Sequence, residues 1–527
     1  MKKVMYMLIT SLVVITSCTG DFESINTNPN GQTEKGLTQR FFHIGGRFTP
    51  MFLNVINVTP AWNYQLQQGL NGDVYSGYMT PPTPFAGNVN NMTYNLIQGW
   101  NSFVWFDAYN AGTVMPNIKN IKDAVAELDG GGMQFSYLAD IVKVAAMHRV
   151  SDVFGPIRYT KFNDVATTGQ YDNQETVYKA FFSELGGAID GLKSFADANN
   201  DKFKPFDMSG FEGNLGKWRK FANSLRLRLA IRISKIDPVL AKIEGEKSLA
   251  SDAGLLDVED MVIHTDGFTH PIFTISNSWG DIRMSAEMES ILKGYNDPRI
   301  GIYFQKSTDA SLGGAYKGIR MGVEISAKSQ YVGHSPIGEI ISKEEIVWMT
   351  ASETYFLKAE AALRGWSGAG DVKQNYEAGI TASFVQHKIS GLSTYLMDAT
   401  NTPNDFVDAL NPVNNITYPS DVKIAFNDAG TNEEKLEQII TQKWIAMFPN
   451  GQEAWSEFRR TGYPRVYPVV VNNSGGEIDT NIQIRRLPFI QAELDSNASN
   501  VQIAVGYLNG PDTGGTRLWW DTGGSNF

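Results

Sequence analysis

Cysteine is nearly absent from this sequence, in which Cys18 is the only one among 527 residues. A lone thiol excludes an intramolecular disulfide and leaves no cysteine cluster to bind a metal ion. Long apolar runs are also missing. The apolar stretch 4–16 is shorter than the roughly 20 residues that cross a bilayer, and no second stretch approaches that length. The chain is therefore not expected to span a membrane.

Positive charge and catalytic motifs are scarce as well. The formal net charge is −11, which argues against nucleic acid as a partner because phosphates demand concentrated Lys and Arg. The sequence has no GxSxG hydrolase elbow, no GxxxxGK[ST] phosphate loop and no GxGxxG dinucleotide loop. Neither a metal nor a cofactor is predicted, because the histidines are scattered without an HExxH pair: His43, His148, His264, His270, His334 and His387.

The first residues have the pattern of an export signal, with two lysines before the apolar stretch. Ile15–Cys18, "ITSC", resembles a lipobox, in which a peptidase cuts before a cysteine that has been lipidated. An ordinary secreted protein whose leader contains a cysteine is the alternative. We predict a lipoprotein signal peptide over 1–17, a lipidated flexible tether over 18–40 that begins at Cys18, and a single ligand-binding domain over 41–527.

Apolar residues recur with helical periodicity in several windows. Helices are predicted over 137–155, 176–195, 216–234, 342–365 and 432–448. Residues 352–389 join a helix, a Gly-rich turn and a second helix, which resembles a tetratricopeptide hairpin. Strand-like pieces, such as 467–471 and 483–489, are short and few. We therefore predict a mainly α fold, with a tetratricopeptide-like helical hairpin scaffold, long irregular loops and a few short strands.

The window 216–234 carries basic residues beside its apolar stripe. Such residues are typical of a helix face that is solvated or ion-paired, and they do not form a predicted binding patch. The residues concerned are Arg219, Lys220, Arg226 and Arg232.

Three loop segments combine aromatic rings with polar side chains. They are "YSGYMTPPTPFAGNVNNMTYN" (75–95), "NSWGDIRMSAEM" (277–288) and "GGAYKGIRMG" (313–322). Rings offer apolar faces to the C–H faces of sugars, and amide or acid groups bind hydroxyls. The alternative is that the rings fill the small core of their own loop. The predicted ligand-binding residues are Tyr75, Tyr78, Phe85, Asn88, Asn90, Trp279, Asp281, Arg283, Tyr316 and Arg320.

An ordered series of motifs spans nearly the whole chain. It includes "RVSDVFGPIRYTKF", "KWRKFANSLRLRLAIRIS", "SWGDIRMSAEMESILKGYNDPRI" and "QKWIAMFPNGQEAWSEFRRTGYP". The series resembles the SusD/RagB family of Bacteroidetes outer-membrane lipoproteins. The resemblance implies a helical, non-enzymatic protein that captures oligosaccharide for a SusC-like TonB-dependent outer-membrane transporter. It also implies a lipid anchor at Cys18 that faces the cell exterior, because Asp21 and Glu23 match the acidic export pattern of the family.

The sequence leaves two other functions open. A RagB-like member of the same architecture would capture peptides, with more charge and backbone pairing than stacked rings. A lipid-anchored glycosidase would need two facing carboxylates, and no local pattern either singles out such a pair or forbids one.

Overall fold

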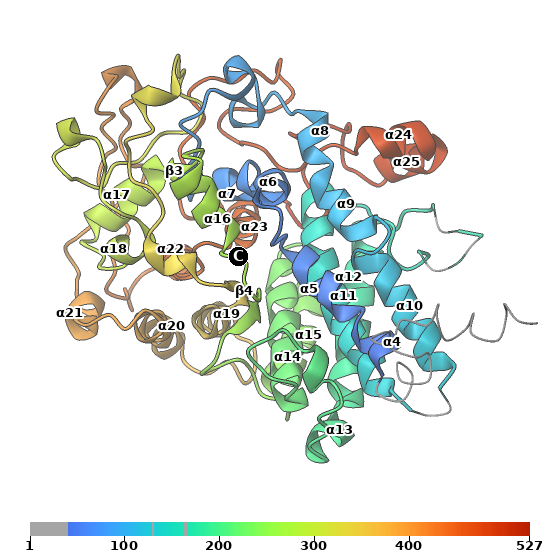
Figure 1. Ribbon diagram of the computed structural model, residues 1–527. Coiled ribbons are helices and arrows are strands. Elements are labelled where there is room, and N and C mark those ends of the chain that lie inside the picture. The colour runs from blue at the N-terminus through green and yellow to red at the C-terminus, as the bar shows by residue number, and fades with distance from the viewer. Residues whose placement is uncertain (1–40, 129–130, 163, 165, 168) are drawn as a thin grey trace, which may run out of the picture.

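The computed structural model describes residues 41–527 except 129–130, 163, 165 and 168 (Figure 1). The predicted signal peptide 1–17, the lipidation site Cys18 and the tether 18–40 lie outside the described residues. The described chain is mainly helical, as predicted, and contains two short two-stranded sheets. No helix in this part of the chain is long and apolar enough to cross a membrane.

The long helices pack in consecutive pairs, which form the predicted hairpin scaffold (Figure 1). Helix α11 packs against α12, α14 against α15, and α19 against α20, and α22 then packs against both α19 and α20. The scaffold helices are α10 (Val114–Ala126), α11 (Met133–Phe154), α12 (Gln174–Gly191), α14 (Leu215–Arg232), α15 (Pro238–Leu249), α19 (Ala351–Leu363), α20 (Val372–Gln386), α22 (Asn432–Ala446) and α23 (Gly451–Thr461).

Paired helices approach closely where a glycine faces an aromatic ring. A Cβ atom on Gly379 of α20 would lie 2.8 Å from the ring of Phe356 on α19. A Cβ atom on Gly191 of α12 would lie 2.3 Å from the ring of Tyr137 on α11. Packed carbon atoms do not approach this closely, so only glycine permits the observed spacing.

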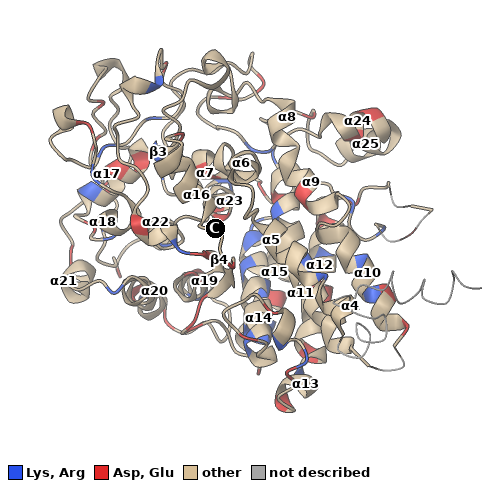
Figure 2. Cartoon of the chain, viewed as in Figure 1, with Lys and Arg blue, Asp and Glu red and all other residues tan. Residues whose placement is uncertain are grey.

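The basic residues of α14 are ion-paired, as predicted, and Figure 2 shows acidic segments among the helices around it. Arg232 is fully buried and donates to Glu457 on α23 at 2.9 Å. Removing one partner of such a buried pair typically costs about 3–5 kcal/mol, because the other charge is left uncompensated. The four pairs are Arg219 with Asp252, Lys220 with Asp257, Arg226 with Glu244 and Arg232 with Glu457.

The predicted helix over 342–365 starts later than expected. Residues 345–349 form strand β4 (Glu345–Met349), which pairs antiparallel with β2 (Met261–His264). The β-branched and aromatic residues of "EIVWM" fit a strand, and Thr350 then caps α19 by accepting from the amide of the third helical residue. The pieces 467–471 and 483–489 form no strands, because no extended neighbour pairs with them along their length.

The remaining elements are short and lie between long irregular segments. They are α4 (Phe42–Gly45), α5 (Phe48–Val55), α6 (Ala61–Tyr64), α7 (Gly72–Tyr75), β1 (Met79–Thr80), α8 (Gln98–Asn101), α9 (Phe103–Tyr109), α13 (Lys193–Asp197), α16 (Pro271–Phe273), β3 (Arg283–Met284), α17 (Ala286–Gly294), α18 (Ile300–Tyr303), α21 (Leu392–Leu396), α24 (Gln491–Ser496) and α25 (Ala498–Val505).

Candidate functional site

The three predicted loops meet in space although they are far apart in the sequence. Strand β1 of the first loop pairs antiparallel with β3 of the second, with Met79 opposite Met284. The third loop joins them through backbone hydrogen bonds of Ile319, whose amide donates to the carbonyl of Met284 at 2.9 Å. The fold therefore gathers these loops at one place.

Tyr75 and Tyr78 are core residues, so neither of these predicted ligand-binding rings is open to a ligand, and the alternative that such rings fill a core holds for both. Only 2% of Tyr75 and none of Tyr78 is exposed. The ring of Tyr75 packs against Trp455, and the hydroxyl of Tyr78 donates to the carbonyl of Trp444. Helix α7 and the residues after it turn inward against α22 and α23, which removes both rings from the surface.

Of the two predicted asparagines, Asn90 stabilises its own loop and Asn88 ties that loop to a distant segment. The Asn90 amide donates to the carbonyl of Phe85 at 2.6 Å, and its Oδ1 accepts from the amide of Met92 at 2.9 Å. The Asn88 amide donates to the carbonyl of Ile325 at 2.8 Å. These groups are engaged within the protein. Phe85 is half-buried and keeps part of its ring accessible.

The second loop has one exposed ring, and its polar side chains are held by hydrogen bonds to neighbouring segments. Trp279 is 38% exposed. Asp281 accepts from the hydroxyl of Thr83 and from the ammonium group of Lys328, each at 2.7 Å, which ties the loop to its neighbours. Arg283 is buried and donates to three backbone carbonyl groups, so it holds the loop in place.

In the third loop, Arg320 stabilises the fold through hydrogen bonds, and Tyr316 is partly exposed. The buried guanidinium of Arg320 donates to the carbonyl groups of Pro468 at 2.9 Å and Asn414 at 3.3 Å. Tyr316 is half-buried. Of the ten predicted ligand-binding residues, Trp279 is thus the most open to a ligand, and Phe85 and Tyr316 retain part of a ring surface.

Another exposed tryptophan, Trp62, is not among the residues predicted from the sequence. It is 49% exposed, and its ring makes an edge-on contact with Phe103 at 5.6 Å. Its helix, α6, packs against the turn 274–278, which leads directly to Trp279. The available signal was the "PAWNY" segment, in which a tryptophan beside asparagine opens a short helix after proline.

These accessible rings lie on adjoining elements. Phe85 makes an edge-on contact with Trp100 of α8 at 5.8 Å, and α8 packs against α9, which carries Phe103. We call this set the aromatic surface: Trp62, Phe85, Trp100, Phe103 and Trp279.

A polar cluster lies directly beside Trp62. The amide of Asn63 donates to Asp107 at 3.0 Å, and the amide of Gln67 donates to the same carboxylate at 2.9 Å. Burial raises the pKa of Asp107 to about 7. The arrangement places ring faces beside polar groups, which suits a ligand with both apolar and hydroxyl surfaces.

Comparison with known proteins identifies the family to which this fold belongs. The family model for SusD-like proteins, described as SusD and RagB outer membrane lipoproteins, matches residues 24–521. This chain belongs to the SusD/RagB family. A search among curated proteins finds no match.

Solved SusD-like structures have the same fold as this chain. A chitin-binding SusD homologue from Flavobacterium johnsoniae is 49% identical, with a TM-score of 0.89 over 92% of this chain and 100% of its own. A SusD homologue from Bacteroides vulgatus is 36% identical, with a TM-score of 0.86 over 93% and 100% of the two chains. A SusD-like protein from Bacteroides thetaiotaomicron is 33% identical, with a TM-score of 0.85 over 91% and 99%.

The polar chemistry of this SusD-like chain is mostly internal. Within the described ranges, no group of three or more His, Cys, Asp or Glu side chains is arranged to hold a metal ion. The buried carboxylates of the scaffold accept from arginines, as Glu353 does from Arg228 at 2.6 Å.

Proposed function

We propose that this SusD-like chain binds oligosaccharide at the aromatic surface and delivers it to a SusC-like TonB-dependent transporter in the outer membrane. The observation that carries the proposal is the exposure of Trp62 and Trp279 on elements that pack together. Exposed rings of this size are stabilised by a ligand that covers them. The binding of chitin by a relative that is 49% identical supports a carbohydrate ligand.

The proposed role is capture without catalysis. Lipid attachment at Cys18 would hold the chain on the outer face of the outer membrane, and the tether 18–40 would let it reach the transporter. A Cys18→Ala variant tests the anchor: it is expected to leave the membrane fraction, whereas a variant that stays in that fraction contradicts lipid attachment. Crosslinking in cells tests the contact with the transporter. The proposal expects a crosslinked partner of the size of an outer-membrane barrel.

Isothermal titration of the purified protein tests the ligand. The panel contains neutral oligosaccharides, acidic oligosaccharides and unfolded peptides. Binding of a neutral oligosaccharide that weakens in Trp62→Ala and Trp279→Ala is the expected result. Binding of peptides alone, or release of reducing ends from a polysaccharide, would overturn the proposal in favour of peptide capture or hydrolysis respectively.

A further inference from the structure

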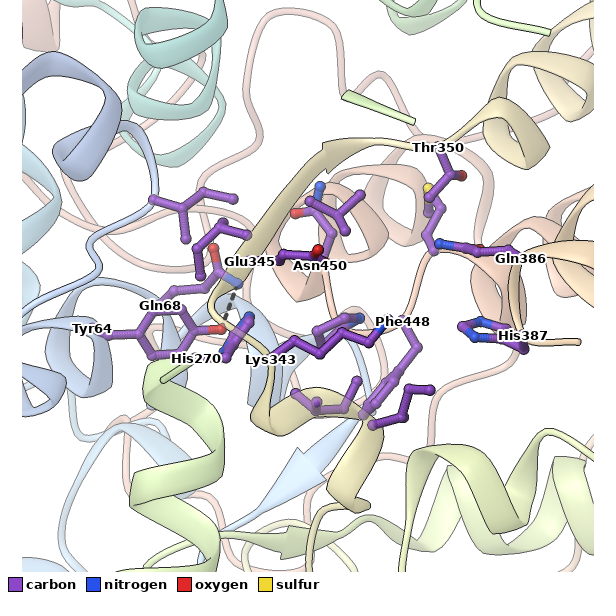
Figure 3. A pocket seen from close by; sticks show the side chains of 17 residues that line it. Tyr64, Gln68, His270, Lys343, Glu345, Thr350, Gln386, His387, Phe448 and Asn450 are labelled. Atoms are coloured by element: carbon purple, nitrogen blue, oxygen red, sulfur yellow. Dashed lines mark hydrogen bonds between the residues drawn. The ribbon is translucent and has the colours of Figure 1, made fainter. Parts of the chain in front are cut away.

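A cavity lies next to α6, between strand β4, the end of α20 and the turn 447–450 that joins α22 to α23 (Figure 3). Its volume is about 100 Å³. On the same measure roughly 10–15 Å³ holds one water molecule, so the cavity has room for a small organic group. It does not have room for an oligosaccharide chain, which separates it from the aromatic surface.

The floor of the cavity is held by its own hydrogen bonds. The hydroxyl of Tyr64 donates to Asp73 at 2.9 Å, and the amide of Gln68 donates to the same carboxylate at 2.8 Å. Arg149 donates to Gln68 and, at 3.1 Å, to Asn450. The floor is therefore a rigid network, and its charged groups are already paired beneath the cavity wall.

His270 directs one hydrogen-bond donor into the cavity. Its Nδ1 accepts from the backbone amide of Ile272 at 3.2 Å, which places the ring proton on Nε2. The side chain is 7% exposed, and burial lowers its pKa to about 3, so the ring is neutral at physiological pH. Nε2 has no hydrogen-bond partner among residues 41–527 as described, and Figure 3 shows the ring beside Tyr64 at one end of the cavity.

Gln386 and His387 form the opposite end of the cavity. The side-chain oxygen of Gln386 is buried, and no described residue donates to it. The neighbouring His387 lies 3.3 Å from the hydroxyl of Tyr303, and burial lowers its pKa to about 4. Figure 3 places Gln386 and His387 across the cavity from His270. The His270 end thus offers a donor, and both histidines are neutral.

Apolar and charged side chains both line the space between the two ends, and Figure 3 shows Lys343 extending across it. Ile341, Ile346 and Phe448 contribute the apolar side chains. Lys343 and Glu345 also line the cavity, and they carry opposite charges. Burying a charged ligand in an enclosure without net charge is costly, whereas a neutral polar group needs only its hydrogen bonds satisfied.

A secondary amide that bears a methyl group fits all of these features. Its carbonyl oxygen accepts a hydrogen bond, its N–H donates one, and its methyl group packs on apolar side chains. We propose that the cavity binds the acetamido group of an N-acetylated sugar residue, with the carbonyl oxygen accepting from Nε2 of His270. The assignment of a sugar as the carrier of this group rests on the proposed glycan function.

Saturation-transfer NMR and titration of the purified protein with N-acetylglucosamine, glucose and glucosamine test the site. The acetyl methyl group is expected to receive the strongest transfer, and both sugars without the acyl group should bind at least about tenfold more weakly. The variant His270→Phe keeps a flat ring and removes the donor, so the affinity for N-acetylglucosamine should fall about tenfold. Ile341→Trp fills the cavity without removing a hydrogen bond and should abolish binding. Tyr507→Ala, at an exposed position away from the cavity, is the matched control.

The outcomes separate this site from the aromatic surface. Equal binding of glucose and N-acetylglucosamine, or unchanged binding by His270→Phe and Ile341→Trp, would overturn the acetamido site. An oligosaccharide that still binds while N-acetylglucosamine does not would refute the cavity assignment alone. Binding of N-acetylglucosamine that depends on His270, in a protein that binds no oligosaccharide, would support the cavity and refute the proposed function.

Discussion

Trp62→Ala tests the aromatic surface most directly, because half of the side chain already lies in solvent. The variant loses the edge-on contact with Phe103, which is worth about 0.5–1.5 kcal/mol of folding free energy. Loss of a stacked ring costs a ligand about 1–3 kcal/mol, by analogy with bases that stack on aromatic side chains. The dissociation constant should therefore rise about 5- to 150-fold, at about tenfold per 1.4 kcal/mol.

The assay is titration calorimetry at 25 °C with the neutral oligosaccharide that binds best, together with a thermal unfolding scan. Tyr507→Ala is the control, because Tyr507 is 43% exposed and follows α25. The control should bind as the wild type does. The reasoning is refuted if Trp62→Ala binds within about twofold of the wild type, or if Tyr507→Ala loses as much affinity.

Three further predictions concern the scaffold. Gly379→Ala should lower the free energy of unfolding by about 1–3 kcal/mol in denaturant titrations, because its Cβ would overlap the ring of Phe356, whereas Gly187→Ala on α12 has open space and should be neutral or stabilising. Arg460→Met should cost about 3–5 kcal/mol, since the buried carboxylates of Glu360 and Glu457 each lose one of their cationic partners; a loss below about 1 kcal/mol would contradict this. Burial raises the pKa of Asp73 to about 7 from an ordinary 3.8, so its protonated form favours the fold at low pH and that stability is lost as pH rises through 7. Asp73→Asn should remove this pH dependence, of which about 3 kcal/mol falls between pH 5 and pH 8, when melting temperatures at these two pH values are compared; an unchanged pH profile would refute it.

Local periodicity predicts most of the helical scaffold, whereas α10, α15 and α23 are not among the predicted helices. An apolar stripe depends only on residues three and four positions apart, so helices such as α14 and α22 follow from their own sequence. The same argument failed at 345–349, where pairing with β2 from a distant part of the chain selects a strand. Pairing with β2 selects a strand there despite the helical pattern. The strand propensity of the β-branched and aromatic residues favours the same outcome.

Ring exposure in loops was not predictable in the same way. Tyr78 is buried because it meets Trp444, which lies 366 residues further along the chain. Asn90 resembles a ligand-binding amide in the sequence, yet it caps the turn that follows it, a common use of asparagine in loops. Trp279 and Tyr78 look alike locally, and only the packing of distant helices decides which ring is open to solvent.

Helix α6 connects the two proposed sites to the scaffold. Trp62 faces outward on this helix, and Tyr64 faces the cavity and donates to Asp73. The same network continues through Gln68 to Arg149 on α11, so a ring on the surface is fixed to a long scaffold helix by consecutive hydrogen bonds. A rigid platform loses little conformational freedom when a ligand binds, which favours affinity without a large interface. A short helix of four residues can therefore support the proposed binding surface, because its position is set by buried contacts and not by its own length.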